Sequence, residues 1–256
     1  MQSIRPSGNQ QKSFVKIMVW SSRYSLKTIC SLNINSCMKY IYNFFNEPIQ
    51  NKFNQSFNYY IYENILKLNF EKLKQDILNL EKEIIKKYPP YSDGKTGLGN
   101  NSLTSRFMYF NLLQMDETKF LKDIIREKHD DFLNTLKYEV GDNYYVQCWA
   151  NVMRKGERIK AHSHGDNNHM YLSGNICVFT ENTNTHYIAP YHSNEFSSKN
   201  ESGKITLFPS WLKHYTDKVN TDLRITIAFD IIEEKSYRED TILNSNDDKE
   251  DHWEKI

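Results

Sequence analysis

Two stretches of the chain carry apolar residues at the spacing of an amphipathic helix. In residues 63–87 and 116–140 these positions recur three, four or seven residues apart, so they share one face of a helix. Asp116 and Thr118 are residue types that cap a helix at its N-terminus. Residues 91–105 are rich in Gly, Asn and Ser and predict a loop. The pattern therefore predicts two helices, over 63–87 and 116–140, connected through a loop.

From about residue 144, apolar and polar positions alternate with the period of a β-strand. The runs are rich in β-branched and aromatic residues, and Gly, Asn, Ser and Pro separate them. We predict five strands, over 144–152, 171–179, 186–189, 204–208 and 223–231. Helices followed by a group of short strands indicate an α+β fold with a mainly β core, in which a sandwich or barrel is carried on the helices.

Composition and charge indicate a folded protein and argue against nucleic-acid and membrane partners. Hydrophobic residues are 39% and aromatic residues 14% of 256, which is enough to bury a core. Lys and Arg number 33 against 32 Asp and Glu, so no nucleic-acid partner is expected. No run approaches the roughly 20 apolar residues of a membrane helix, so no membrane association is expected either. The four cysteines form no C-x-x-C pair, which favours reduced thiols in an intracellular, cytoplasmic protein.

Charge is distributed unevenly along the chain. Residues 1–56 contain seven basic residues and one acid, whereas 233–256 contain nine acids and four basic residues. We therefore predict a basic N-terminal extension (1–56), a single domain (57–232) and a solvated acidic tail (233–256). Within the domain, helical support occupies 57–140 and the β core 141–232. The acid-poor N-terminal composition is typical of an organellar targeting segment as well as of a variable leader.

Five of the eight histidines lie between residues 162 and 192. Residues i and i+2 of an extended chain point to the same side, so His162 and His164 could present two imidazoles to one divalent cation. In the same way His164 and Asp166 could present an imidazole and a carboxylate. Either pair supplies two ligands of a metal site, although such short spacings also occur by chance.

A second element follows downstream. Residues 203–213 are a strand-like run and a Pro-marked corner, and they lead to His214, with Arg224 ten residues later. Arg224 and Thr226 share one face of the strand predicted over 223–231. On a surface strand this arginine would face solvent. In a barrel interior it requires an anion, because a buried unpaired guanidinium is very costly, and a bidentately bound dicarboxylate would be such an anion.

In this order and spacing the residues resemble the Fe(II)- and 2-oxoglutarate-dependent dioxygenases. More narrowly, they resemble members that are common in phages and marine bacteria and are related to prolyl 4-hydroxylases. The resemblance covers about 57–232. It is carried by Trp149-Ala-Asn151, by Gly156 six residues before His162, by Leu172-Ser173-Gly174, and by the segments GKITLFPSWLKH and LRITIAFDI. The segment TGLGNNSLTSRF is similar to one that precedes such domains.

The resemblance implies a double-stranded β-helix, or jelly-roll, core with supporting N-terminal helices. It implies Fe(II) as cofactor, with 2-oxoglutarate and O2 as co-substrates. The expected reaction hydroxylates a small metabolite or a peptide side chain and releases succinate and CO2. Arg224, with Thr226, would bind the 5-carboxylate of 2-oxoglutarate. Asn151 would contact the keto acid or the substrate, and a structural hydrogen bond is the alternative for this side chain.

Two sets of metal ligands stay open. Counting forward from Gly156 favours His162, His164 and His214, whereas the usual carboxylate-containing set would be His164, Asp166 and His214. The ambiguity arises because the link from the histidine pair to Leu172-Ser173-Gly174 is about three residues longer than in many members of the family.

An alternative function also stays open, a non-catalytic, cupin-like β-barrel that binds a metal or another ligand. The other histidines of this region, His169, His186 and His192, are expected in loops or at the rim. The sequence predicts neither the substrate nor the oligomeric state.

Overall fold

The computed structural model describes residues 13–20, 24–31, 39–46, 57–141, 143–164, 170–190, 195–238 and 252–256. The chain divides into two compact units, Met1–Ile65 and Leu66–Ile256. The predicted boundary between residues 56 and 57 stays a prediction, as does the targeting role of the first segment.

The described strands of the first unit form an antiparallel meander. The strands are β1 (Ser13–Trp20), β2 (Tyr24–Ser31), β3 (Lys39–Asn46) and β4 (Asn58–Ile65). Each strand pairs with the next in sequence. These strands were not predicted from the sequence.

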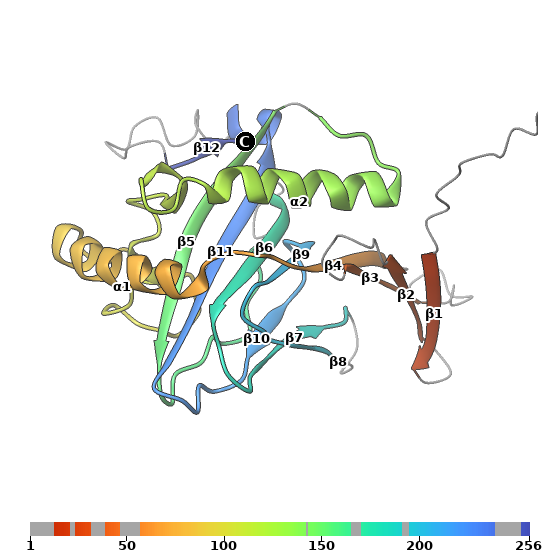
Figure 1. Ribbon diagram of the computed structural model, residues 1–256, viewed down its shortest axis with the longest axis horizontal. Helices are drawn as coiled ribbons and strands as arrows, with labels where there is room; N and C mark the ends of the chain where they lie inside the picture. The colour runs from red at the N-terminus through yellow and green to blue at the C-terminus, as the bar shows by residue number, and fades with distance from the viewer. Residues whose placement is uncertain are drawn as a thin grey trace, which may run out of the picture. The chain divides into compact units, whose positions relative to one another are not determined.

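The second unit contains two antiparallel sheets (Figure 1). In the larger sheet the strand order is β9-β6-β11-β5-β12, and in the smaller sheet it is β10-β7-β8. The larger sheet consists of β5 (Tyr144–Arg154), β6 (Met170–Phe179), β9 (Lys204–Pro209), β11 (Leu223–Glu233) and β12 (Glu254–Lys255). The smaller sheet consists of β7 (Asn184–Ile188), β8 (Glu195–Lys199) and β10 (His214–Thr216).

The chain passes from one sheet to the other between β6 and β7, between β8 and β9, and on both sides of β10. The prediction of an α+β fold with a mainly β, jelly-roll core is confirmed, and the two sheets are not closed into a barrel. Each of the five predicted strands forms, with ends that differ by at most two residues. The short strands β8, β10 and β12 were not predicted, because two to five residues with few apolar positions show no clear alternation.

Alternation along β11 separates the hydrophobic core from the polar cavity. Ile225, Ile227 and Phe229 are fully buried on one face. Arg224 and Thr226 lie on the other face and line a pocket between the sheets. Because side chains of a strand alternate between its faces, this one strand builds both the core and the site.

Two helices cross in front of the larger sheet in the view of Figure 1. They are α1 (Phe70–Lys87), which packs against β5 and β6, and α2 (Leu121–Leu136). The predicted apolar stripe of α1 is buried. No helix of the described residues has the combination of length and apolar character needed to cross a membrane.

Both helices begin later than predicted. Residues 58–65 form β4, and α1 starts after Asn69, whose side chain accepts a hydrogen bond from Lys72 N at 3.1 Å. The predicted cap of α2 was wrong, because Asp116 instead pairs with Lys119 and the Thr118 hydroxyl donates to the Leu112 carbonyl.

Two 3₁₀ turns, Thr104–Arg106 and Leu112–Gln114, lie between the helices. The prediction of a solvated tail was wrong for the described residues at the C-terminus. Glu254 and Lys255 pair with β5, and Trp253 is buried. A buried indole outweighs the charge of the neighbouring residues, because burial of a large aromatic side chain is strongly favourable.

Gly174 lies where β6 passes closest to its neighbours. A Cβ atom there would lie 2.3 Å from Cζ of Phe229 and 2.7 Å from the carbonyl oxygen of Thr206. We expect Gly174→Ala to lower the free energy of unfolding by about 1–3 kcal/mol through overpacking, as measured by urea denaturation. Gly141→Ala is the control, because its nearest neighbour is the far end of the Tyr144 side chain at 3.2 Å, and it should change stability by less than about 1 kcal/mol. Equal stability of the two variants would contradict this packing.

Candidate functional site

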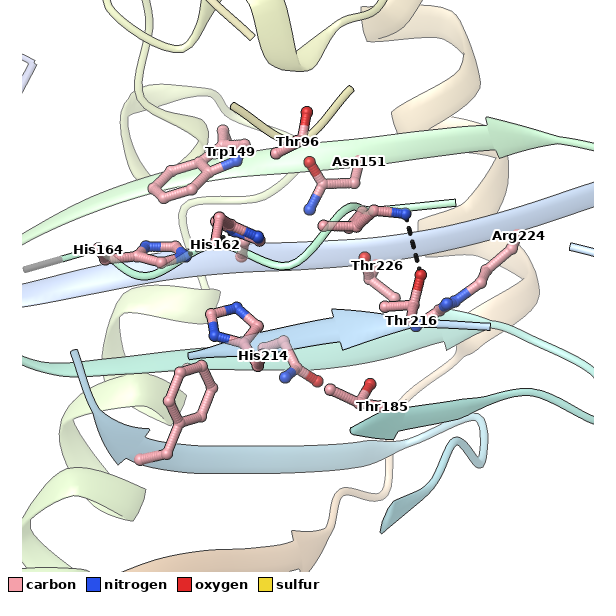
Figure 2. Close-up of a pocket in the computed structure, with 15 residues that line it drawn as sticks. Thr96, Trp149, Asn151, His162, His164, Thr185, His214, Thr216, Arg224 and Thr226 are labelled. Carbon is pink, nitrogen blue, oxygen red and sulfur yellow. Dashed lines mark hydrogen bonds between the residues drawn. The ribbon is translucent and has the colours of Figure 1, made fainter. Parts of the chain in front are cut away.

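A pocket lies between the two sheets of the second unit (Figure 2). Side chains of β5, β6, β9 and β11 line it from the larger sheet, and those of β7 and β10 from the smaller one. Thr96 and His162 add walls from segments outside the strands. The pocket thus draws on parts of the chain that are far apart in sequence.

Three imidazoles meet at one end of this pocket. The ligating nitrogens of His162, His164 and His214 lie within 4.8 Å of one another. Backbone hydrogen bonds hold the segments together: His162 and His214 exchange two, at 3.0 and 2.9 Å, and His164 N donates to the Ser210 carbonyl at 2.9 Å. The segment that contains His162 and His164 is not a regular strand. A single β-bridge between His162 and His214 brings the three imidazoles together. We call these three residues the histidine cluster.

Hydrogen bonds orient each imidazole of the cluster. The Nδ1 atoms face acceptors: His162 faces the carbonyl of Lys160 at 2.8 Å, His214 the carbonyl of Leu212 at 2.9 Å, and His164 the carboxylate of Asp230 at 2.8 Å. A carbonyl oxygen can only accept, so Nδ1 carries the proton in His162 and His214. Their Nε2 atoms are therefore the nitrogens free to bind a cation.

The electrostatics of the cluster differ from ring to ring. Burial lowers the pKa of His162 to about 4 and lowers the pKa of His214 well below its ordinary value. Burial alone would also lower the pKa of His164, but the charge of Asp230 and its hydrogen bond raise it. The Nε2 atoms of His164 and His162 are 3.2 Å apart, a distance at which one proton can be shared between them. A divalent cation bound here would take the place of that proton.

The donor set fits a divalent transition metal. Imidazole nitrogen suits Fe(II), Zn(II) and related ions, and three convergent rings leave further coordination positions for other ligands. Aromatic rings surround the cluster: Trp149 stacks on His164 with a centroid distance of 5.8 Å, and Phe208 packs edge-on against His214 at 4.7 Å. This apolar surrounding limits the access of water and fixes the rings.

Arg224 lies in the same pocket as the cluster. It is 2% exposed, and its Nε and Nη1 atoms meet no acceptor among the residues that the structure describes. In Figure 2 its side chain extends from β11 toward Thr216 and Thr226, both of which line the pocket. Burial lowers the pKa of Arg224, but a guanidinium stays charged in proteins. A buried cation with two unused donors fits a carboxylate ligand.

Asn151 also lines the pocket, and a hydrogen bond from outside the pocket fixes its side chain. Thr104 of the first 3₁₀ turn donates to its Oδ1 at 2.6 Å. This bond directs the amide nitrogen of Asn151 toward other acceptors. The two expectations for Asn151, a structural hydrogen bond and a place in the site, are therefore compatible.

The loop before the first 3₁₀ turn presents Thr96 to the pocket. Asp93 organises this loop, since its carboxylate accepts hydrogen bonds from the backbone nitrogens of Lys95, Gly97 and Gly99 at 3.0–3.1 Å. The Thr96 carbonyl in turn accepts from Lys160 N at 2.7 Å, next to the histidine cluster. Gly97, at φ 81°, lies so close to Lys160 that a Cβ atom would clash with its side chain.

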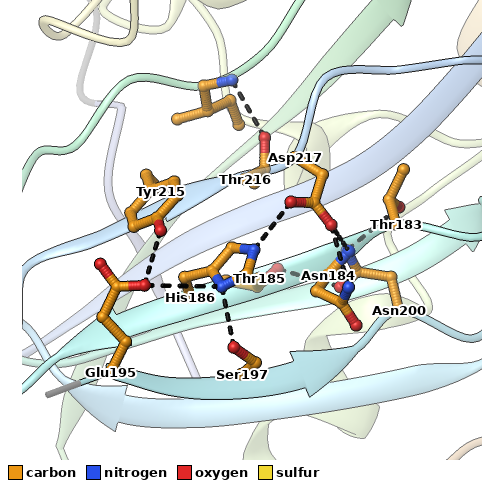
Figure 3. Close-up of polar contacts among 11 residues, drawn as sticks. Thr183, Asn184, Thr185, His186, Glu195, Ser197, Asn200, Tyr215, Thr216 and Asp217 are labelled. Atoms are coloured by element: carbon orange, nitrogen blue, oxygen red, sulfur yellow. Dashed lines mark hydrogen bonds and ion pairs between the residues drawn. The ribbon is translucent and has the colours of Figure 1, made fainter.

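Some histidines lie away from the pocket or outside the described residues. Asp166, His169 and His192 fall outside the residues that the structure describes. His186 lies on β7, and its imidazole contacts Asp217 at 2.8 Å and Ser197 at 2.8 Å (Figure 3). It does not line the pocket, since Thr185 and not His186 faces it from β7.

Sequence reasoning missed three residues of the site. Asp230, Thr104 and Thr96 contact or surround the predicted residues. They lie within the quoted segments LRITIAFDI and TGLGNNSLTSRF, but no role was assigned to them. For Asp230 a signal was present, because it lies on the same strand face as Arg224 and Thr226 by the two-residue period. The partners of Thr104 and Thr96 lie too far along the chain for any sequence pattern to reveal.

A match to a family model agrees with the resemblance found in the sequence. Residues 147–230 match the model of the family described as "Putative 2OG-Fe(II) oxygenase". Among solved structures, a Pseudomonas putida prolyl-4-hydroxylase is similar, with 9% identity and a TM-score of 0.48 over 68% of this chain and 88% of that one. A Trichoplax adhaerens prolyl hydroxylase, solved with a hypoxia inducible factor peptide fragment, has 14% identity and a TM-score of 0.48 over 66% and 80%. No curated protein matches the chain.

Two buried arginines give a stability test of the pocket. Arg224 lacks acceptors for two donor atoms, whereas Arg106 is bonded to carbonyls that include those of Tyr88 at 3.2 Å and Ser102 at 2.8 Å. Without added ligand, Arg224→Met should raise the free energy of unfolding by about 1–3 kcal/mol, because it removes an unpaired buried charge. Arg106→Met should lower the free energy of unfolding by about 3 kcal/mol, because it leaves these carbonyl acceptors without a donor. Destabilisation of both variants in urea denaturation would contradict the unpaired state of Arg224.

Proposed function

We propose, on the premise that this chain belongs through residues 147–230 to the 2OG-Fe(II) oxygenases, that it is a dioxygenase that hydroxylates a small molecule or a peptide side chain. In the proposed reaction a C–H bond of the substrate becomes C–OH, and 2-oxoglutarate and O2 are converted to succinate and CO2. Fe(II), 2-oxoglutarate and O2 are the cofactor and co-substrates that the family requires.

The observation that carries the proposal is a buried guanidinium in the same pocket as three convergent imidazoles. Arg224 needs an anion, and the histidine cluster needs a cation. A ligand with one end on the metal and a carboxylate at the other end satisfies both groups at once. 2-Oxoglutarate has this form, and a non-catalytic metal site would leave Arg224 without a partner.

Each residue of the pocket then has a distinct task. The histidine cluster holds Fe(II), which when bound supplies the activation of O2. Arg224 binds the distal carboxylate of 2-oxoglutarate, and Thr226, two residues along the same strand face, donates a further hydrogen bond to it. Asn151, held by Thr104, orients the keto acid or the substrate beside the metal.

The rings of Trp149 and Phe208 shield the metal end of the pocket. Shielding of this kind strengthens the ion pairs inside the pocket and excludes water that would compete with the substrate. The loop around Thr96 forms another wall near His162 and is well placed to contact the substrate.

The ligand set can be tested by metal content. Among His162→Ala, Asp166→Ala and the wild type, we expect His162→Ala to lose bound Fe(II) while Asp166→Ala keeps it, because His162 converges with His164 and His214. Anaerobic Fe(II) loading followed by elemental analysis measures this. Circular dichroism checks that the variants are folded. Loss of iron from Asp166→Ala alone would assign the metal to His164, Asp166 and His214 instead.

The co-substrate can be tested by binding and turnover. We expect Fe(II)-dependent release of succinate from 2-oxoglutarate, and at least about a hundredfold weaker 2-oxoglutarate binding in Arg224→Met, since a buried charged pair contributes about 3 kcal/mol or more. Arg154→Met is the matched control, because Arg154 pairs with Glu81 at the surface and should leave binding unchanged. Tight zinc binding with neither 2-oxoglutarate binding nor O2-dependent chemistry would reject the oxygenase in favour of the non-catalytic barrel.

A further inference from the structure

Asp230 is a buried carboxylate that touches the histidine cluster from outside the pocket. We propose that Asp230 is a positioning residue that supplies, through His164, the negative charge which three neutral imidazoles lack. This inference rests on the proposed function, because it assigns a role in holding Fe(II).

The contacts of Asp230 place its charge on one ring of the cluster. Its Oδ1 and Oδ2 atoms lie 2.8 and 3.0 Å from Nδ1 of His164. Asp230 is only 3% exposed, so water does not weaken this contact. A carboxylate bonded to the far nitrogen of a metal-binding imidazole fixes its tautomer and makes the near nitrogen a better electron donor.

A second set of bonds keeps the carboxylate in place. Ser173 Oγ lies 2.5 Å from Asp230 Oδ1 and 2.9 Å from Ser210 Oγ. A carboxylate can only accept, so the Ser173 hydroxyl donates to Asp230, and its oxygen is left to accept from Ser210. Ser210 also accepts, through its carbonyl, from His164 N at 2.9 Å. Ser210 therefore holds the backbone of His164 directly and the carboxylate behind its ring through Ser173.

The charge at the metal gives such a residue a role. A carboxylate and two imidazoles give Fe(II) one negative charge, whereas the histidine cluster gives none. No described residue that lines the pocket is an acid. Among the described residues the contact of Asp230 with His164 thus supplies this charge, and it does so without using a coordination position.

Cobalt binding tests the proposal without relying on activity. Co(II) is the probe, and its visible absorption in competition with a chelator gives its affinity. We expect Asp230→Asn, which has the same shape without the charge, to bind Co(II) about 10–100-fold more weakly and to shift the absorption spectrum. Ser173→Ala, which keeps the charge but frees the carboxylate, should weaken binding less.

Asp217→Asn is the matched control. Asp217 lies 2.8 Å from Nε2 of His186, a carboxylate–imidazole contact of the same length that does not line the pocket. This variant should bind Co(II) like the wild type. If Asp230→Asn does not fold, Ser173→Ala decides: unchanged affinity and spectrum would overturn the proposal.

The outcomes separate the inference from the proposed function. If the wild type binds no Co(II), the proposed metal site fails. If the wild type binds Co(II) and folded Asp230→Asn matches its affinity and spectrum, the site stands but Asp230 has no such role. Equal weakening in Asp230→Asn and Asp217→Asn would also overturn it, since the effect would then not come from contact with His164.

Discussion

The two backbone hydrogen bonds between His162 and His214 are the constraint on which the site depends. They join the segment after β5 to the start of β10, which the sequence separates by the whole of β6 to β9. Neither segment could place its imidazole alone, since each is short and irregular at that point. The bridge fixes both backbones, and carbonyls within each segment then fix the rings. The geometry of the cluster is thus set before any cation binds.

One strand connects this cluster to the rest of the pocket. On β11, Asp230 contacts the ring of His164, and Arg224 and Thr226 lie on the same face of the strand toward its N-terminal end. β11 is the strand between β5 and β6, and its opposite face is fully buried in the hydrophobic core. A strand held on both edges and on one face has little freedom to shift. The two opposite charges, the carboxylate and the guanidinium, therefore keep a constant separation along it.

The pocket holds a buried charge whose hydrogen bonds are incomplete, and the surrounding strands fix its position. Arg224 is buried, and its Nε and Nη1 atoms have no acceptor among the described residues. A buried donor without an acceptor is unfavourable, and a carboxylate ligand, as in the proposed function, would supply the acceptor. By contrast, Arg106 and Asp93, which shape the neighbouring loop, are amply hydrogen-bonded. These two structural charges are thus satisfied, whereas the guanidinium in the pocket keeps two nitrogens without an acceptor among the described residues.

The sequence by itself determined the fold class, the five main strands and the apolar faces of both helices. It also singled out His162, His164, His214 and Arg224, which the structure brings together in one pocket. Alternation and helical spacing are local properties, so they can be found in a single chain. Tertiary structure alone decided how β10 pairs, and that Asp230 lies behind His164 while Thr104 lies behind Asn151. These contacts join residues far apart in sequence, and only chain folding, which buries their polar groups together, selects such partners.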